Sequence, residues 1–172
     1  MKTAKFIPLI ALLCLASCRE VPSYDIAPAK GDSLKESMIN ANRLIAQGEE
    51  QQIEAYLLRR GWQLPRLDGG VRVMETAQGN PAQSAKVDYE DTVAIRYRVQ
   101  TLGGNEVYDW RTDTVVCGRL QPTRGLDAAL RTLHRGSQAT VIVPSEQAYG
   151  LVGDGDHIRT RMVLVYELII ED

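Results

Sequence analysis

One stretch of the chain decides the fold: Ala139-Thr140-Val141-Ile142-Val143-Pro144-Ser145-Glu146-Gln147-Ala148-Tyr149-Gly150. Its first half is rich in β-branched residues and predicts a strand. Pro144 ends that strand, because proline has no backbone N–H to donate to a neighbouring strand. Ser145 and Glu146 are typical of a turn. The stretch therefore predicts a strand that leads into a turn, with Tyr149 in the loop beyond it.

Strand patterns lie on both sides of this stretch, with a single helix just before it. The helix is expected from about Leu126 to His134, because its apolar residues fall on one helical face. One helix among several strands predicts the α+β class, with a mostly antiparallel sheet and the helix laid across one face. The other strands are expected at 71–75, 92–99, 108–110, 114–117 and 162–170.

A second helical segment precedes the strands, over residues 32–61. Its apolar side chains repeat at helical spacing, and Gly61 is a plausible stop after Arg59 and Arg60. The segment is either a helical stalk or a helix packed on the following domain, or it serves for self-association through residues 32–60. We favour a stalk or a packed helix over self-association, because the apolar stripe is narrow and interrupted. The main domain is then expected over 62–172.

The first residues have the pattern of a secretory signal. Lys2 and Lys5 precede a short apolar run, and the following Leu15-Ala16-Ser17-Cys18 resembles the lipobox of bacterial lipoproteins. We expect a signal peptide over 1–17, a tether over 18–31, and a lipid on Cys18 that anchors the chain to a membrane. This pattern predicts a lipid-anchored protein of the cell envelope, with the outer membrane facing the periplasm preferred.

Composition excludes several function classes. The chain of 172 residues has 20 basic and 22 acidic residues, a net charge of −2, so we expect no nucleic-acid partner. Three cysteines and two histidines are too few for a zinc framework. Asp154-Gly155-Asp156-His157 lacks the further carboxylates of a calcium loop and is interpreted as a solvated turn. We therefore expect no metal and no cofactor.

The aromatic residues offer a different kind of site. Phenylalanine occurs once, at Phe6 in the expected signal peptide, so tyrosine and tryptophan supply all the aromatic surface beyond it. Tyrosines at strand ends and loops predict a shallow apolar cleft with hydroxyls at its rim. These tyrosines are Tyr97, Tyr108, Tyr149 and Tyr166.

From about Gly70 to Glu171 the chain resembles an FKBP-type peptidyl-prolyl cis-trans isomerase domain. The most specific part of the resemblance is Pro144 followed by Ala148-Tyr149-Gly150. The resemblance implies a curved antiparallel sheet wrapped around one short helix. It is also carried by Thr92–Tyr97, Glu106–Asp109, Gly118, Arg124-Gly125-Leu126, Arg135-Gly136, Ile142-Val143, Ile158 and Leu164-Val165-Tyr166.

The resemblance also implies roles for individual residues. Tyr97, Tyr108 and Tyr166 would form the pocket walls, and Asp109 would be a buried carboxylate whose hydrogen bonds shape the site. The Tyr149 hydroxyl would donate to a substrate carbonyl. These five are the expected catalytic residues.

The expected substrate-binding residues include the departures from the family pattern. Leu126 replaces a tryptophan at the pocket floor, and Asp113 or Val115 lies where an aromatic wall is usual. Pro122 replaces an aliphatic residue beside the site. The backbone N–H of Thr123 would hold the carbonyl after proline, and Ile158 would close the pocket from above.

The function implied by the resemblance is isomerisation of Xaa–Pro bonds during the folding of envelope proteins. A tyrosine-lined apolar pocket would desolvate and twist the amide. The expected partners are proline-containing or unfolded envelope polypeptides. The alternative is a catalytically weak or inactive FKBP-like chaperone or protein-binding module, since the same cleft could hold an extended segment without isomerising it.

Overall fold

The computed structural model describes residues 31–78 and 85–171 of the chain. The expected signal peptide, nearly all of the tether, and Cys18 lie outside these residues. The chain divides into two compact units, Met1–Ser37 and Met38–Asp172, and the second contains the whole sheet. None of the described helices is both long enough and apolar enough to cross a membrane.

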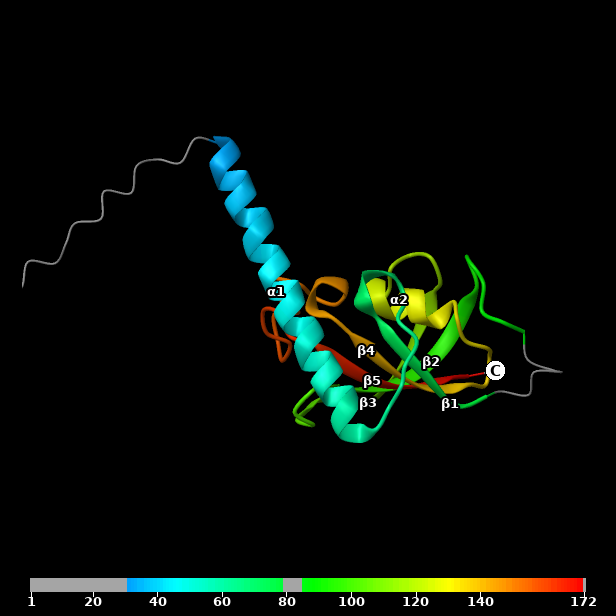
Figure 1. Ribbon diagram of the computed structural model, residues 1–172. Helices are drawn as coiled ribbons and strands as arrows, with labels where there is room; N and C mark the ends of the chain where they lie inside the picture. Colours follow the sequence, from blue (N-terminus) through cyan, green and yellow to red (C-terminus); the bar gives the residue numbers. More distant parts are fainter. Residues whose placement is uncertain (1–30, 79–84, 172) are drawn as a thin grey trace, which may run out of the picture. The chain divides into compact units, whose positions relative to one another are not determined.

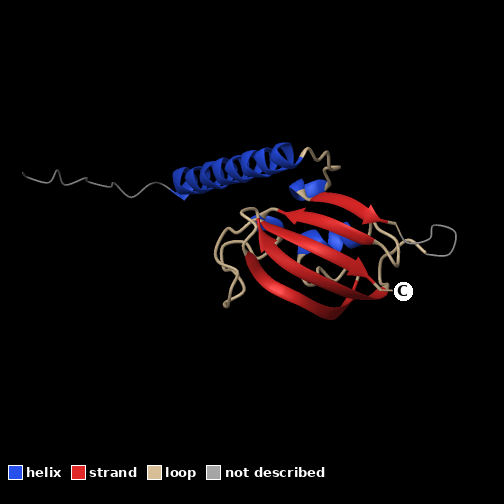
Figure 2. Ribbon diagram, turned by 90° about the horizontal axis from the view of Figure 1, so that it is seen from below, coloured by secondary structure: helices blue, strands red, loops and turns tan. Residues whose placement is uncertain are grey.

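Five antiparallel strands form one sheet in the order β1-β4-β5-β2-β3. Figure 2 shows them side by side as a curved layer. The α+β class and the antiparallel sheet are thus confirmed. The strands are β1 (Arg72–Ala77), β2 (Thr92–Thr101), β3 (Glu106–Val116), β4 (Gln138–Val143) and β5 (Leu164–Ile170).

Two of the expected strands are one continuous strand in the structure. Residues 108–110 and 114–117 were expected to flank a loop, but β3 runs from Glu106 to Val116 without interruption. Its polar centre pairs with β2, with Thr112 opposite Arg96 and Thr114 opposite Ala94. β3 lies at the edge of the sheet, where polar side chains can face solvent. For this reason its amino-acid composition resembles that of a loop.

Helix α2 (Arg124–Leu130) is shifted and shorter than the expected helix over 126–134. It begins earlier because Thr123 caps it: the Thr123 hydroxyl oxygen accepts a hydrogen bond from the Leu126 N–H at 3.2 Å. It ends at Leu130 because the chain then turns. The Leu133 carbonyl accepts a hydrogen bond from the Val87 N–H at 3.0 Å, so this segment pairs with residues before β2.

The inner face of the sheet packs against α2. Val141, Val143 and Leu164 point to this side and are fully buried with Leu126 and Leu130 of the helix. This is the larger of the two hydrophobic cores, and it contains the expected site residues of β2 and β5.

The outer face of the same strands packs against helix α1 (Gly31–Arg60) (Figure 1). Ile142 of β4 and Val165 of β5 are buried there with Ile53, Tyr56 and Leu57 of the helix. Packing on the domain, one of the two favoured alternatives for this segment, is thus seen at these three residues. A division at residue 62 would cut through this second core.

Charge also fixes α1 to the sheet. Arg72 of β1 is only 3% exposed, and its guanidinium donates hydrogen bonds to the carboxylates of Glu50 and Glu54, the latter at 2.6 Å. At the C-terminal end of the helix, Gly61 has a φ of 65°. The Gly61 N–H donates to the Leu58 carbonyl at 3.1 Å, which ends the helix at the expected glycine.

We predict that Ile53→Ala lowers the free energy of unfolding by roughly 2–5 kcal/mol, because it removes a fully buried side chain and leaves a cavity. Leu58→Ala on the same helix is the matched control. Leu58 is 83% exposed, so this change should stay within about 0.5 kcal/mol. Urea unfolding of the full chain measures both. Equal effects of the two substitutions would show that α1 is not part of the cooperative core.

Candidate active site

Four tyrosines come together on the inner face of the sheet, beside α2. Tyr97 of β2 and Tyr166 of β5 are buried, and their ring centroids lie 5.9 Å apart. Tyr108 of β3 and Tyr149 of the loop after β4 pack against the same core and stay partly exposed. The structure thus brings together all four tyrosines that the sequence placed at a cleft. We call Tyr97, Tyr108, Tyr149 and Tyr166 the tyrosine cluster.

The floor of the cluster consists of aliphatic side chains from three different segments. Val115 of β3, Leu126 of α2 and Ile158 of the loop before β5 are all buried in the same core as the tyrosines. Thr123 and Pro122 precede α2, the first buried and the second half-buried. Of the expected substrate-binding residues, Val115, Leu126 and Ile158 therefore share one core with the cluster, and Thr123 lies near Tyr166.

The floor of the tyrosine cluster is not exposed to solvent at Leu126. Its exposed fraction is 0%, so no solvent reaches the position where the resemblance implies an indole. Ile158 belongs to the same core and is only 3% exposed. The part of the site that solvent reaches is provided by the partly exposed Tyr108 and Tyr149.

Burial raises the pKa of each tyrosine hydroxyl in the inner part of the cluster. For Tyr166 the cause is desolvation, to which nearby Tyr149 and Tyr97 add. The Tyr166 hydroxyl lies near the Thr123 side chain but makes no well-aligned hydrogen bond among the described residues. For Tyr97 and Tyr149 desolvation is again the largest cause. All three hydroxyls therefore stay protonated at neutral pH and remain hydrogen-bond donors.

The expectation that Asp109 is a buried carboxylate is wrong. Its side chain is exposed, and its Oδ1 accepts a hydrogen bond from the adjacent Trp110 N–H at 2.7 Å. The pairing of β2 with β3 is irregular here, because the register shifts on both sides of the pair Val99 and Tyr108. The pairing is regular as far as Arg111 opposite Tyr97, and the shift then places Tyr108, rather than Asp109, opposite Val99.

The carboxylate that reaches the cluster is Asp154. The Tyr108 hydroxyl donates a hydrogen bond to its Oδ2, and its Oδ1 accepts from the N–H groups of Asp156 and Ile158, both at 2.9 Å. Sequence reasoning assigned Asp154 to a solvated turn, which is wrong for this residue. The Asp-Gly-Asp pattern indicates a carboxylate that binds nearby backbone N–H groups. No local pattern reveals the distant partner Tyr108.

This hydrogen bond changes the titration of both groups. The bond to Asp154, followed by partial burial, raises the pKa of Tyr108 to about 12. Burial alone would raise the pKa of Asp154, but the hydrogen bonds from Tyr108 and from the backbone outweigh it, so that pKa is lowered. At neutral pH the pair is a phenol donating to a carboxylate. It joins β3 to the loop that carries Ile158.

Arg111 is a further residue that the sequence did not single out. Its guanidinium lies 3.8 Å from the centre of the Tyr108 ring, and it lowers the pKa of Tyr97, though less than burial raises it. A cation over an aromatic face is attracted by the ring electrons. Arg111 thus helps to hold the partly exposed Tyr108 in place. Among the described residues, no cluster of histidine, cysteine and acidic side chains could hold a metal ion.

Comparisons with known proteins identify the family of the domain. A family model described as FKBP-type peptidyl-prolyl cis-trans isomerase matches residues 83–171. A protein of Pseudomonas aeruginosa, described as a probable FKBP-type 25 kDa peptidyl-prolyl cis-trans isomerase, is 33% identical over 102 residues. This match covers 59% of the present chain and 43% of the relative, so the chain spans less than half of that protein's length.

The fold is also similar to that of a solved structure. A crystal structure of a peptidyl-prolyl cis-trans isomerase from Pseudomonas syringae pv. tomato superposes with a TM-score of 0.61 at 23% sequence identity. The match covers 76% of the present chain and 93% of that protein. At this identity the comparison supports the fold, and the expected FKBP-like architecture is confirmed.

We predict that Asp154→Ala lowers the pKa of Tyr108 from about 12 toward the ordinary value of 10, because it removes the acceptor that holds the phenolic proton. Tyrosine absorbance titration measures this, with Tyr108→Phe identifying the signal. The raised pKa stabilises the folded state at pH values below about 10, and this stabilisation is lost as pH rises toward 12. Asp109→Ala is the matched control and should leave the titration unchanged. The assignment fails if Asp109→Ala shifts the titration and Asp154→Ala does not.

Proposed function

Because the chain belongs to the FKBP-type peptidyl-prolyl cis-trans isomerase family, we propose that it isomerises Xaa–Pro bonds at the tyrosine cluster. The observation that carries the proposal is that Tyr97, Tyr108, Tyr149 and Tyr166 gather beside α2 over one buried core. Rotation about such a bond faces a barrier of roughly 18–20 kcal/mol, while the two isomers differ by about 1 kcal/mol or less. No bond has to be made or broken.

An apolar site lowers this barrier by favouring the twisted amide. Twisting ends the resonance between nitrogen and carbonyl, so the transition state has less separated charge than the planar amide and loses less on leaving water. Only an interaction that is stronger in the transition state accelerates the reaction. The buried walls of Tyr97, Tyr166 and Val115 would supply the water-poor surroundings.

Individual side chains would orient the peptide. Tyr149 is partly exposed, and its hydroxyl would donate to a substrate carbonyl. The Thr123 N–H, at the start of α2, would bind the carbonyl after proline. Pro122 would contact the peptide at the rim. Asp109, which is exposed, takes no part in this mechanism.

The buried floor implies that the site opens when a prolyl ring enters. Leu126 is 0% exposed and Ile158 is 3% exposed, so a prolyl ring can reach Leu126 only if neighbouring side chains move. A leucine also offers a smaller contact than the indole of the family pattern, a loss of roughly 1.5–2.5 kcal/mol at the usual area coefficient. Both effects favour modest activity on short peptides.

We further propose that the chain works in the bacterial envelope on proline-containing or unfolded polypeptides. The support is the sequence pattern that ends at Cys18, with the outer membrane facing the periplasm preferred. Self-association through residues 32–60 stays a prediction. The exposed Met38, Ile39 and Leu44 are the apolar side chains of α1 that a second copy could cover.

We predict that the full chain accelerates isomerisation of short Xaa–Pro peptides in a protease-coupled assay at micromolar concentration. Tyr149→Phe should lower kcat/KM about three- to tenfold, because it removes one hydrogen bond to the substrate. Tyr89→Phe is the matched control: Tyr89 is 61% exposed and lies outside the cluster, so its change should leave the rate unaltered.

A rate equal to the uncatalysed one would remove the catalytic claim. The alternative, a protein-binding module, is favoured by the buried Leu126, because solvent does not reach the position where the family pattern has an indole. In that case the chain should suppress aggregation of an unfolded client without isomerising it. The effect should weaken in Tyr108→Ala, which alters the exposed part of the cluster.

The envelope proposal predicts that Cys18 carries a lipid when the protein is expressed in a bacterium. Mass spectrometry of the membrane fraction should find the mature chain beginning at acylated Cys18. In Cys18→Ala the protein should leave the membrane fraction, whereas Cys117→Ala, the control cysteine, should stay in it. A chain that remains on the membrane without Cys18, or that begins at Met1, would refute lipid anchoring.

A further inference from the structure

Ser145 lies at the start of the loop that carries Tyr149 and is bound by a carboxylate from α1. The Ser145 N–H donates to Glu49 Oε2 at 2.9 Å, and the Ser145 hydroxyl donates to Glu49 Oε1. Glu49 is 8% exposed and Ser145 is 5% exposed. This is therefore a buried carboxylate with both oxygens engaged by one residue, although the two residues are separated by 96 positions in sequence.

The carbonyl of Ser145 is hydrogen-bonded to the two residues on either side of Tyr149. It accepts a hydrogen bond from the Ala148 N–H at 3.1 Å and another from the Gly150 N–H at 2.8 Å. These two residues flank Tyr149 directly. Ser145 is thus bonded to Glu49 through its donors and to both sides of Tyr149 through its acceptor. A continuous set of hydrogen bonds leads from α1 to the tyrosine cluster.

If Glu49 served only to dock the helix on the domain, a buried carboxylate would be an unfavourable residue at this position. Removing a charge from water is costly unless hydrogen bonds replace the lost hydration, and an apolar side chain would pack at less cost. The helix is already fixed by Ile53 in the outer core and by the ion pairs of Glu50 and Glu54 with Arg72. In addition to these contacts, Glu49 accepts hydrogen bonds from the backbone N–H and the hydroxyl of Ser145.

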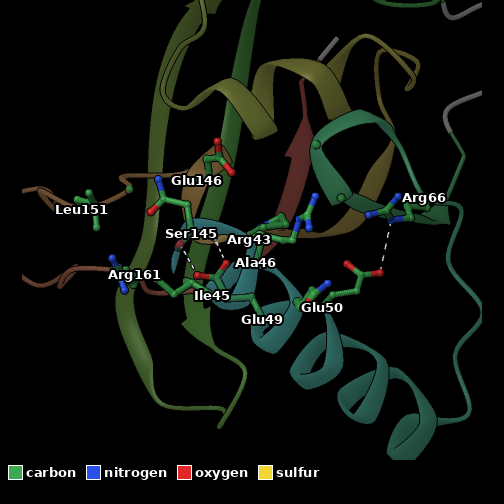
Figure 3. A pocket seen from close by; sticks show the side chains of 16 residues that line it. Arg43, Ile45, Ala46, Glu49, Glu50, Arg66, Ser145, Glu146, Leu151 and Arg161 are labelled. Carbon is green, nitrogen blue, oxygen red and sulfur yellow. Dashed lines mark hydrogen bonds and ion pairs between the residues drawn. The ribbon is translucent and has the colours of Figure 1, made fainter. Parts of the chain in front are cut away.

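A cavity of about 540 Å³ lies between this part of α1 and the loop. In Figure 3 the Glu49 carboxylate points to Ser145 across one side of it, while Glu50 points away toward Arg66. Among the described residues, the hydrogen bonds that join α1 to the loop are those between Glu49 and Ser145. The loop is therefore held to the helix at one point rather than by a packed interface.

We propose that Glu49 is a positioning residue for the isomerase site, which fixes Ser145 and thereby sets the place of the Tyr149 hydroxyl. The proposal rests on the proposed isomerase function for its effect on rate. In this proposal α1 positions a residue of the site in addition to covering one face of the sheet. Release of Glu49 would loosen the turn that presents Tyr149 while leaving the tyrosine itself unchanged.

The test uses the full chain and three substitutions. Glu49→Gln keeps the size of the side chain and removes the charge that accepts both bonds, whereas Ser145→Ala removes the hydroxyl from the other side. Glu50→Gln is the matched control, because it weakens the pairing of α1 with Arg72 and leaves Ser145 untouched. Two measurements are made on each variant: kcat/KM on Xaa–Pro peptides, and amide hydrogen exchange of Ala148 and Gly150.

We expect Glu49→Gln to lower kcat/KM about tenfold, the effect of losing a charge-assisted hydrogen bond. Exchange at Ala148 and Gly150 should rise by a similar factor, while the amides of β4 and β5 keep their protection. The double variant Glu49→Gln/Ser145→Ala should lose little more than the larger single loss, since both act through one contact. Glu50→Gln should lower stability without changing kcat/KM or the exchange of these two amides.

Exchange separates this proposal from the isomerase proposal. If the unaltered chain has no isomerase activity, the isomerase proposal fails, and the exchange of Ala148 and Gly150 alone decides whether Glu49 fixes the loop. The positioning role is overturned if Glu49→Gln leaves that exchange unchanged, whatever the activity. It is also overturned if Glu50→Gln has the same effect on rate as Glu49→Gln, or if the losses of the two single variants simply add.

Discussion

The structure depends on two adjacent strands that are buried on both faces. In β4, Ile142 points to the core beneath α1 and Val143 to the core beneath α2, and in β5 Val165 and Leu164 do the same. A strand whose successive side chains point to opposite faces can serve two cores only if both faces are covered. The pairing of β4 with β5 therefore requires a helix on each side of the sheet. It explains why residues 141–143 of β4 and residues 164–166 of β5 are continuous apolar runs instead of alternating with polar residues.

The same constraint brings α1 close to the site. The loop after β4 leaves the sheet between the two covered faces, so its second residue, Ser145, can bond to α1 while Tyr149 packs against the inner core. A cluster of tyrosines also needs more polar partners than a cluster of phenylalanines, because each buried hydroxyl loses water. Tyr108 finds Asp154 and Tyr97 lies near Arg111, whereas the Tyr166 hydroxyl has no well-aligned partner in the described part of the chain.

Sequence patterns predicted the ends of helices and strands, which depend on neighbouring residues, but not the hydrogen bonds between residues far apart in the chain. The strand that ends at Pro144 and the helix end at Gly61 follow from local chemistry, and both are present. Asp109 was expected to be buried because its neighbours match the family pattern, but the irregular pairing of β2 with β3 leaves it exposed. Asp154 and Glu49 act through partners 46 and 96 positions away, and no local period signals such a bond.

The replacement of an indole by Leu126 and the closed floor are consistent with each other. An empty apolar hollow costs free energy, because its lining atoms lose contacts that water does not replace. With a smaller side chain at the floor, the neighbouring residues gain by moving in, and Leu126 and Ile158 are indeed closed to solvent. Any ligand must then supply the free energy that reopens the site, which lowers its apparent affinity by the populated fraction of the open form. The loop that carries Ile158 is held near one end by Asp154 and Tyr108, and the loop that carries Tyr149 is held by Glu49 and Ser145. Two polar contacts, and not the hydrophobic walls alone, therefore hold the segments around the proposed site in place.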